Sequence, residues 1–301
     1  MRAYVTGASG FVGRWLTEHL RAEGDDVVSP EVEITDAAAL AAAVADARPD
    51  AVYHLAAVAN VGDSWADPHH TFSVNATGTL NLLEAARAVT PAPVVLLVCS
   101  AEVYGRVAPS DLPLDEDAPL RPVSPYAASK VAAEYLGVQA HLAYGLPVIR
   151  ARAFNHIGPG QAPTFVVSSL ARQIAAVAMH GGGVVEVGNL SPRRDFTDVR
   201  DVVRAYRLLV EHGRPGDAYN VCSGEDVAVS QLAERLIVLA GVDVELRVVP
   251  ERIRDIDVPV LRGDPRRLVD ATGWRRERSL DATLADVLRG WQEALAAPNP
   301  R

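Results

Sequence analysis

The feature that most constrains this chain is a short apolar run that leads directly into a glycine-rich turn. Residues 2–6 read RAYVT and run into TGASGFVG, which places Gly7, Gly10 and Gly13 three residues apart. Glycine adopts the positive φ that a tight turn requires, and it lets a phosphate approach the backbone. A helix that begins near Gly10 would point its first amides at that phosphate. Strand, turn and helix in this order predict a dinucleotide-binding unit rather than a purely structural turn.

The other side chains of this turn are also candidates for contact with the dinucleotide. Together with the glycines, they are Ser9, Phe11 and Val12. The spacing is G-x-x-G-x-x-G and not the G-x-G-x-x-G of the common dinucleotide fingerprint. In this respect the turn resembles that of the short-chain dehydrogenase/reductase superfamily.

The first half of the chain alternates strand-like and helix-like segments. Strands are predicted at residues 2–6, 26–29, 51–54, 93–99 and 147–151. Helices are predicted at 11–23, 37–47, 70–89 and 125–144, which are rich in alanine and leucine at helical spacing. Continuous apolar strands separated by helices indicate a parallel sheet that is covered on both faces. With short, right-handed crossovers, this order predicts an α/β fold with a doubly wound Rossmann sheet.

The second half is less regular and contains more proline, glycine and arginine. Helices are predicted at 164–180, 199–212, 230–240 and 282–296, and strands at 184–187, 219–222 and 244–249. We predict a dinucleotide-binding domain over residues 1–152, to which 196–222 returns. Residues 153–195 and 223–301 are then expected to form a smaller, mixed α/β substrate-binding domain.

Charge and composition exclude several classes of partner. The formal net charge of −9 disfavours nucleic acid and anionic membranes, because such polyanions repel an acidic surface. The longest apolar runs are too short to span a bilayer, and a strand that starts at Arg2 leaves no room for a signal peptide. Cys99 and Cys222 lack metal-ligand spacing, so we expect reduced thiols and no metal site. These observations predict a cytoplasmic protein.

The only lysine of the chain is Lys130, four residues after Tyr126. Ser124 and Pro125 are suited to the N-cap and first position of a helix, so Tyr126 and Lys130 should share one helical face. A phenol titrates near pH 10, and a neighbouring cation and nicotinamide ring are expected to lower its pKa. A compact ammonium reaches between a phenol and a ribose diol better than a planar guanidinium does. The alternative is a chance pair on an exposed helix, for which the sole lysine would have to occupy this position by accident.

A third catalytic candidate is Ser100, which follows the apolar run VVLLVC. Ligands of open α/β sheets bind outside the carboxyl ends of the strands, where this hydroxyl is expected to lie. We predict that Ser100 hydrogen-bonds the substrate oxygen that Tyr126 protonates. A serine in this position is otherwise an ordinary turn residue.

Five segments together resemble the extended short-chain dehydrogenases that act on nucleotide sugars. They are TGASGFVG, YHLAA at 53–57, VNATGT at 74–79, SAEVYG at 100–105 and YAASK at 126–130. The resemblance implies that Leu55, Ala56, Ala57 and Asn75 line the cofactor cleft. It also implies a homodimer formed through the helices at 70–89 and 125–144.

The cofactor is expected to be NAD(P)H, with the preference left open. Ser29, Pro30 and Glu31 match neither the acidic residue that suits NAD nor the arginine that suits NADP. Asp36 occupies the position that contacts adenine in the extended members of the superfamily. It is equally suited to cap the alanine-rich helix that follows, so both readings stay open.

The second half carries a narrower resemblance. RAFNHIGPGQ at 152–161, VGNLSPRRDFTDVRDVVRAY at 187–206 and YNVCSG at 219–224 are similar to the GDP-4-keto-6-deoxy-D-mannose reductases. The resemblance implies that Asn155 and Arg194 lie near the sugar diphosphate, which a guanidinium can bind with two hydrogen bonds. The further substrate-binding candidates are Val187, Asn189, Arg193 and Arg262, and a solvated surface role is equally open for the last two.

The resemblance implies reduction of the C4 ketone of GDP-4-keto-6-deoxy-D-mannose to GDP-D-rhamnose. Tyr126 would supply the proton, Ser100 would hold the oxygen and Lys130 would fix the ribose. Glu102 keeps an alternative open, because the related GDP-mannose 4,6-dehydratases carry a carboxylate at this position that moves the C5 proton. An epimerase and a non-catalytic dinucleotide-binding regulator are the remaining hypotheses.

Overall fold

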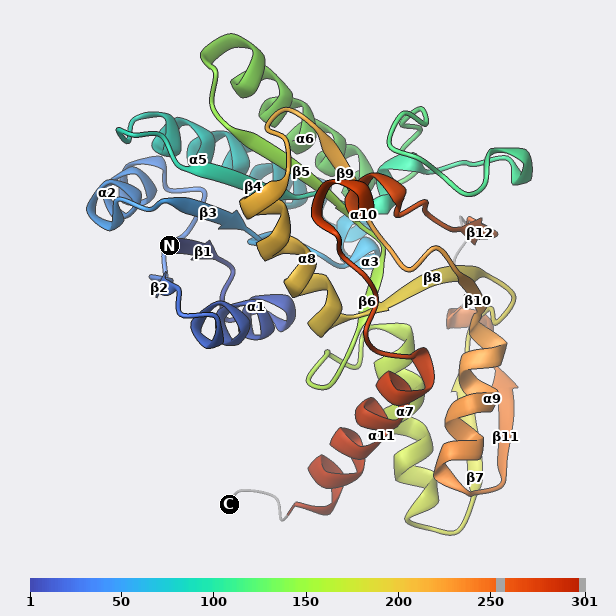
Figure 1. The fold of residues 1–301 in the computed structure, drawn as a ribbon. Coiled ribbons are helices and arrows are strands. Elements are labelled where there is room, and N and C mark those ends of the chain that lie inside the picture. The colour runs from blue at the N-terminus through green and yellow to red at the C-terminus, as the bar shows by residue number, and fades with distance from the viewer. Residues whose placement is uncertain (253–257, 298–301) are drawn as a thin grey trace.

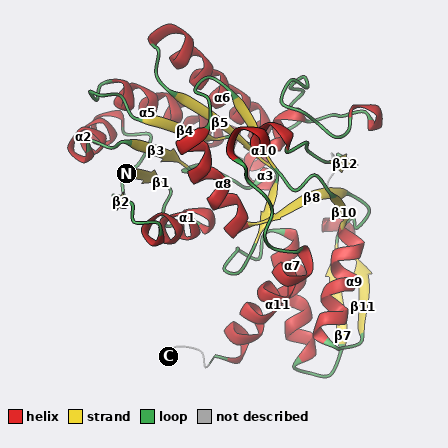
Figure 2. Ribbon diagram, viewed as in Figure 1, coloured by secondary structure: helices red, strands yellow, loops and turns green. Residues whose placement is uncertain are grey.

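The computed structural model describes residues 1–252 and 258–297 and has a parallel sheet at its centre (Figures 1 and 2). The strand order is β2-β1-β3-β4-β5-β9, and all neighbouring strands of this sheet are parallel. The strands are β1 (Arg2–Thr6), β2 (Asp26–Val28), β3 (Ala51–His54), β4 (Val94–Val98), β5 (Val148–Ala153) and β9 (Ala218–Val221). The predicted doubly wound sheet is therefore confirmed.

Helices cover both faces of this sheet because its strands are apolar on both sides. Successive residues of β1 illustrate this, since Ala3 and Val5 pack into one buried cluster and Tyr4 into another. One face is covered by α1 (Phe11–Ala22), α8 (Val199–His212) and α10 (Arg266–Thr272). The other is covered by α2 (Ala37–Ala47), α5 (Gly78–Arg87) and α6 (Pro125–Tyr144).

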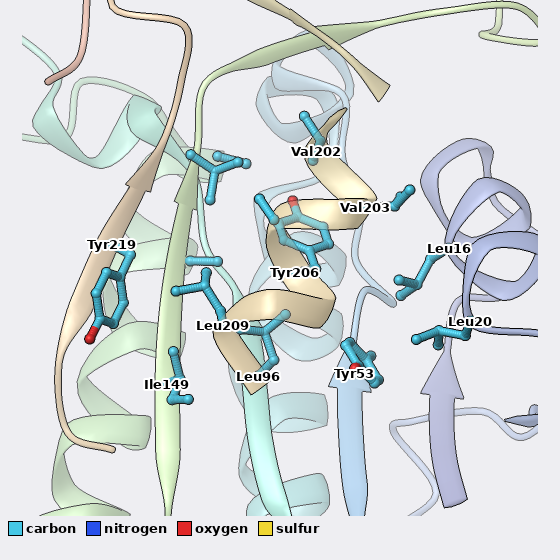
Figure 3. Close-up of a cluster of buried hydrophobic side chains, with 14 of the residues drawn as sticks. Leu16, Leu20, Tyr53, Leu96, Ile149, Val202, Val203, Tyr206, Leu209 and Tyr219 are labelled. Atoms are coloured by element: carbon cyan, nitrogen blue, oxygen red, sulfur yellow. The ribbon is translucent and has the colours of Figure 1, made fainter. Parts of the chain in front are cut away.

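The packing of α8 against the sheet is shown in Figure 3. Tyr206 and Leu209 of this helix lie over strands that present Leu96 and Ile149, and all four side chains are buried. Leu16 and Leu20 of α1 complete this layer beside β1, next to Tyr53 of β3. The chain thus returns from the smaller region to place α8 and then β9 in the sheet assembly.

The smaller region lies beyond the carboxyl ends of the sheet strands (Figure 1). Its helices are α7 (Val166–Ala178), α9 (Val229–Ala240) and α11 (Leu280–Ala296). Its strands are β6 (Asn155–Ile157), β7 (Gly183–Val187), β8 (Arg193–Asp198), β10 (Asp226–Ala228), β11 (Val244–Val248) and β12 (Val260–Leu261). Leu170, Ile174, Leu232, Leu236 and Leu284 form much of its own core, which is separate from the two cores of the sheet.

The helix predicted at 70–89 is divided in the structure. It consists of α4 (Pro68–Phe72), a π-helical turn (Ser73–Thr77) and α5. Within the turn, the carbonyl of Asn75 accepts a hydrogen bond from Thr79 Oγ1 at 2.6 Å. Such single π turns often occur at functional sites, and this one lies beside α6. A short helix before it, α3 (Val61–Ala66), was not predicted.

Within the described ranges, no helix combines the length and the apolar character needed to cross a bilayer.

Candidate active site

A cavity of about 890 Å³ lies at the carboxyl ends of β1, β3, β4 and β5. One wall comes from the sheet side and includes Gly7, Leu55, Ser100 and Tyr126. The opposite wall comes from α7, β7 and β8 of the smaller region and includes Arg194. The cavity is therefore placed where open α/β sheets bind ligands, with a second surface facing the strand ends.

Two glycines of the first turn are required by their surroundings. Gly7 has a φ of +71°, and a Cβ there would lie 2.7 Å from the amide nitrogen of Ala56. A Cβ on Gly13 would lie 2.1 Å from the carbonyl oxygen of Gly7, so this residue allows α1 to pack onto the turn. All six predicted residues of the turn line the cavity, namely Gly7, Ser9, Gly10, Phe11, Val12 and Gly13.

The N-terminus of α1 has no side-chain cap. Gly10 occupies the N-cap position, and the residues that follow it face the cavity. The first amides of a helix need an acceptor, and the positive end of the helix dipole favours an anionic one. A glycine cradle beside an uncapped helix start suits the pyrophosphate of a dinucleotide.

Ser100 and Tyr126 are brought together from two different elements. Ser100 follows β4 and caps the 3-10 turn Ala101–Tyr104, with its Oγ accepting from the Glu102 amide at 3.2 Å. Tyr126 lies in the first turn of α6, which Ser124 caps through the amide of Ala127 at 3.1 Å. Ser100 and Tyr126 both line the cavity, and both residues are 8% exposed.

The electrostatics of the tyrosine differ from the sequence-based expectation. Burial raises the pKa of Tyr126 to about 12, against the opposing effect of Ser100, and the charge of Glu102 adds to the increase. The Lys130 ammonium donates to the carbonyl of Val98 at 2.7 Å, and burial lowers its pKa. The pKa of Tyr126 is therefore raised in the structure, and the lowering expected from Lys130 together with a nicotinamide ring stays a prediction. The increase arises because desolvation disfavours the phenolate, while the ammonium is directed to a backbone carbonyl.

A raised pKa keeps the phenol protonated at neutral pH, which is the state that an acid catalyst needs. The hydroxyl pair of Ser100 and Tyr126 can hold a carbonyl oxygen and deliver one proton to it. Glu102 lines the same cavity beside them and is partly buried.

The predicted residues of the cofactor cleft separate into two groups. Leu55, Ala56 and Ala57 line the cavity. Asn75 is 2% exposed and lies behind that wall, where its side chain binds both backbone groups of Val58. Its Nδ2 also donates to Ser129 Oγ of α6 at 2.9 Å.

Asp36 lies outside the cavity lining and caps α2. Its Oδ1 accepts from the amide of Ala39 at 3.0 Å, which is the helix-cap alternative considered for this residue. Contact with adenine stays a prediction.

The candidates for substrate binding also separate. Asn155, Val187, Asn189 and Arg194 line the cavity.

Arg193 and Arg262 do not belong to the lining of this cavity, so a part for them in substrate binding stays a prediction. Both guanidinium groups bind the Asp226 carboxylate, Arg262 through Nη1 at 3.1 Å and Arg193 through Nε. Because β8 pairs with both β10 and β12, these ion pairs tie β8 and the residue after β12 to β10.

Several lining residues were missed by the sequence analysis. His156, directly after Asn155, stacks on Phe11 with ring centroids 6.3 Å apart, and burial lowers its pKa to about 4. Arg252 also lines the cavity and bonds the carbonyl of Glu186. The segment NHIGPG after the last predicted strand of the first half was the available signal for His156. Nothing local marked Arg252 among the many arginines.

Over residues 1–252 and 258–297, no cluster of three or more histidine, cysteine, aspartate or glutamate side chains could hold a metal ion. Cys99 and Cys222 are both buried free thiols.

Comparison with known proteins places this geometry in one family. Residues 30–287 match the family described as GDP-mannose 4,6 dehydratase. GDP-6-deoxy-D-mannose reductase from Pseudomonas aeruginosa is 40% identical over 296 residues, which cover 97% of each chain. UDP-glucose 4-epimerase from Mycolicibacterium smegmatis is 33% identical, over 98% of this chain and 95% of the relative.

The solved structure of RMD from Pseudomonas aeruginosa complexed with NADPH is similar, with a TM-score of 0.88 and 40% identity. The match covers 97% of this chain and 99% of that one. With a family match over most of its length and relatives that cover nearly all of it, this chain belongs to the GDP-mannose 4,6-dehydratase family of nucleotide-sugar enzymes.

Proposed function

We propose that this protein reduces the C4 ketone of a GDP-linked 4-keto-6-deoxyhexose with NAD(P)H. The substrate would be GDP-4-keto-6-deoxy-D-mannose and the product GDP-D-rhamnose. The observation that carries the proposal is one cavity lined by Ser100, Tyr126 and the glycine turn, in which burial keeps the pKa of Tyr126 high. A relative of 40% identity is named a GDP-6-deoxy-D-mannose reductase, and the similar solved structure is a complex with NADPH.

The residues of the cavity perform the acid half of this reaction. Bound NAD(P)H supplies the hydride that C4 receives. As the C4 oxygen gains negative charge, Ser100 donates a hydrogen bond to it and Tyr126 transfers its proton. The ketone thereby becomes a hydroxyl, and the tyrosinate recovers its proton from solvent. Lys130, buried one helical turn after Tyr126, stabilises this transient tyrosinate.

The dinucleotide would lie along the glycine turn, with its pyrophosphate at the uncapped start of α1. Leu55, Ala56 and Ala57 would form the wall beside it. The end of β2 carries Ser29 and Glu31 in place of a ribose-binding aspartate or a phosphate-binding arginine. The proposal is therefore NAD(P)H.

The nucleotide sugar would enter from the smaller region. Asn155 and Arg194 line that side of the cavity and suit a diphosphate, while Val187 and Asn189 extend the same wall. In this arrangement residues 1–152 and 196–222 serve the cofactor. Residues 153–195 and 223–301 serve the substrate.

A dehydratase is the second candidate because Glu102 lines the cavity beside the hydroxyl pair. A carboxylate there could move a C5 proton during loss of water. The two activities are separated by incubating the protein with GDP-mannose and no added reductant. Formation of a ketosugar would identify a dehydratase.

We further propose a cytoplasmic homodimer. Four large apolar side chains on α5 and α6 are exposed, namely Leu80, Tyr135, Leu142 and Tyr144. Two packed copies of this helix pair would bury them. Sedimentation equilibrium measures the mass directly, and Leu142→Glu should shift it toward the monomer.

The direct test of the reductase combines purified protein, GDP-4-keto-6-deoxy-D-mannose and NADPH. We expect NADPH oxidation and formation of a GDP-6-deoxyhexose that comigrates with GDP-D-rhamnose. If neither NADPH nor NADH is consumed, the proposed function is rejected.

A further inference from the structure

The catalytic helix carries a third polar residue that the proposed mechanism does not use. Tyr126, Lys130 and Glu134 follow one another at steps of four residues, so they lie along one side of α6. Glu134 is fully buried, with 0% exposure. Burial lowers the pKa of Lys130, and the negative charge of Glu134 opposes part of this decrease.

Arg152 of β5 holds this carboxylate with a forked contact. Its Nη2 lies 2.6 Å from Glu134 Oε1, and its Nε lies 3.1 Å from Oε2. Arg150 adds a contact from Nη1 to Oε1 at 2.9 Å. The middle of α6 is thus joined to the sheet by a buried, charge-assisted fork.

The same guanidinium also holds the segment that follows Ser100. Nη1 of Arg152 donates to the Tyr104 hydroxyl at 3.0 Å, and that hydroxyl donates to Asn220 Oδ1 at 2.6 Å. Tyr104 ends the 3-10 turn that Ser100 caps. We name the contacts among Glu134, Arg152, Tyr104 and Asn220 the Arg152 link.

We propose that the Arg152 link is a positioning device that sets Ser100 and Tyr126 at their working separation. One rigid, planar group holds both elements that bring the reacting hydroxyls to the cavity. A shift of either element would change the distance between those hydroxyls.

Stability alone does not account for this arrangement. Burying a glutamate and an arginine carries a desolvation penalty, and apolar residues of similar volume are often as stabilising. Other acidic side chains are buried too, among them Asp25 and Asp201, so burial of charge alone does not single out this link. What distinguishes it is that one guanidinium contacts both the helix that carries Tyr126 and the turn that Ser100 caps.

The sharpest variant is Tyr104→Phe, which removes one hydroxyl from the link and keeps the packed ring. The matched control is Tyr53→Phe, because the Tyr53 hydroxyl is buried and makes no hydrogen bond among the described residues. We expect Tyr104→Phe to lower kcat by about tenfold or more, as for a small misplacement of reacting groups, with KM and NADPH affinity unchanged. Tyr53→Phe should keep the kcat of the wild type.

A second variant, Arg152→Lys, keeps the charge but cannot hold Glu134 and Tyr104 together. Its kcat should fall further than that of Tyr104→Phe. If this variant does not fold, Tyr104→Phe decides the question alone. An unchanged kcat for Tyr104→Phe, or an equal fall in both tyrosine variants, would overturn the proposal.

The kinetic part of this inference rests on the proposed function, so a readout without turnover is needed. Amide hydrogen exchange should become faster at residues 100–105 and 126–134 in Tyr104→Phe and not in Tyr53→Phe. If the wild-type protein does not reduce the ketosugar, the proposed function is rejected. The amide hydrogen exchange rates of the variants would then decide alone whether the Arg152 link positions the two segments. Unchanged exchange in both segments would refute the positioning role.

Discussion

The two regions of this molecule hold their strands together in different ways. In the sheet, β1, β3 and β4 are buried between helices by aliphatic and aromatic side chains. In the smaller region, β8 reads RRDFTD, and its polar side chains make hydrogen bonds and ion pairs while Phe196 packs into the apolar core. Its Asp195 accepts hydrogen bonds from the amide and hydroxyl of Ser223 and the amide of Gly224. Apolar layers build the frame of the site, whereas specific polar contacts shape the cavity wall that we propose faces the nucleotide sugar.

The largest effect is expected where the two regions meet at the reacting atoms. Tyr126→Phe removes the proton donor, and general acid catalysis of this kind contributes about 10²–10⁴ in rate. We expect kcat to fall by that factor while NADPH binding, measured by its fluorescence, stays the same. If turnover persists at the wild-type rate, Tyr126 is not the acid.

A helical glycine in each region gives the next contrast. Gly13→Ala in α1 would place a Cβ 2.1 Å from the Gly7 carbonyl oxygen, so we expect NADPH affinity to be lost. Gly290→Ala in α11 has its nearest neighbour at 3.9 Å, and it should stabilise the protein by about 0.5–1 kcal/mol through its higher helix propensity. Calorimetric NADPH titration and chemical denaturation measure the two effects. If both variants had the same NADPH affinity and the same change in the free energy of unfolding, the requirement for glycine in the turn would be refuted.

Lowering the pH should change the stability contributions of His54 in the sheet and Asp195 in the smaller region in opposite directions. Burial lowers the pKa of His54 to about 3 from 6.5, so the folded state binds this proton less readily than the unfolded chain. Stability from His54 is therefore lost as the pH falls from 6.5 toward 3. Burial raises the pKa of Asp195 to about 6 from 3.8, so its folded state gains stability as the pH falls from 6 to 3.8.

Two variants separate these contributions. Relative to the wild type, His54→Gln should lose less free energy of unfolding between pH 6.5 and 4.5, because its neutral amide takes up no proton. Asp195→Asn should lose more over the same interval, since the stabilising protonation is absent. Urea unfolding at a series of pH values measures both slopes. Parallel curves for all three proteins would contradict the assigned signs.

The smallest effect is expected at the strand pairing of the smaller region. Asp226→Asn weakens two ion pairs whose arginine side chains are 42% and 35% exposed, so about 1 kcal/mol of stability should be lost. The same variant should raise KM for the nucleotide sugar without changing NADPH affinity. If NADPH affinity changed and the KM for the nucleotide sugar did not, Asp226 would act on the cofactor-binding region, which contradicts this prediction.

The contrast also explains which parts of the structure were predictable. Buried strands such as β3 and β4 and the capped helix α6 were placed within a residue or two, because apolar runs and Ser124-Pro125 are local signals. The strands β6, β8, β10 and β12 were missed, because most are short or rich in polar residues and their partners are distant in sequence. Strand propensity depends strongly on such context.

The same limit applies within the site. The glycine turn, Ser100, Tyr126 and Lys130 were found from motifs that follow a strand or open a helix. The pairing of Arg193 and Arg262 with Asp226 depends on three strands that meet only after folding. The raised pKa of Tyr126 depends on burial, which no spacing of charged residues reveals.

The most direct test of the central claim is transfer of deuterium to GDP-4-keto-6-deoxy-D-mannose from NADPH that carries deuterium at both positions of the nicotinamide C4. NMR and mass spectrometry of the product locate the label. We predict one deuterium at C4 of the sugar with the wild type, and none with Tyr126→Phe over the same interval. A product without deuterium at C4 would contradict the account, even if NADPH had been consumed.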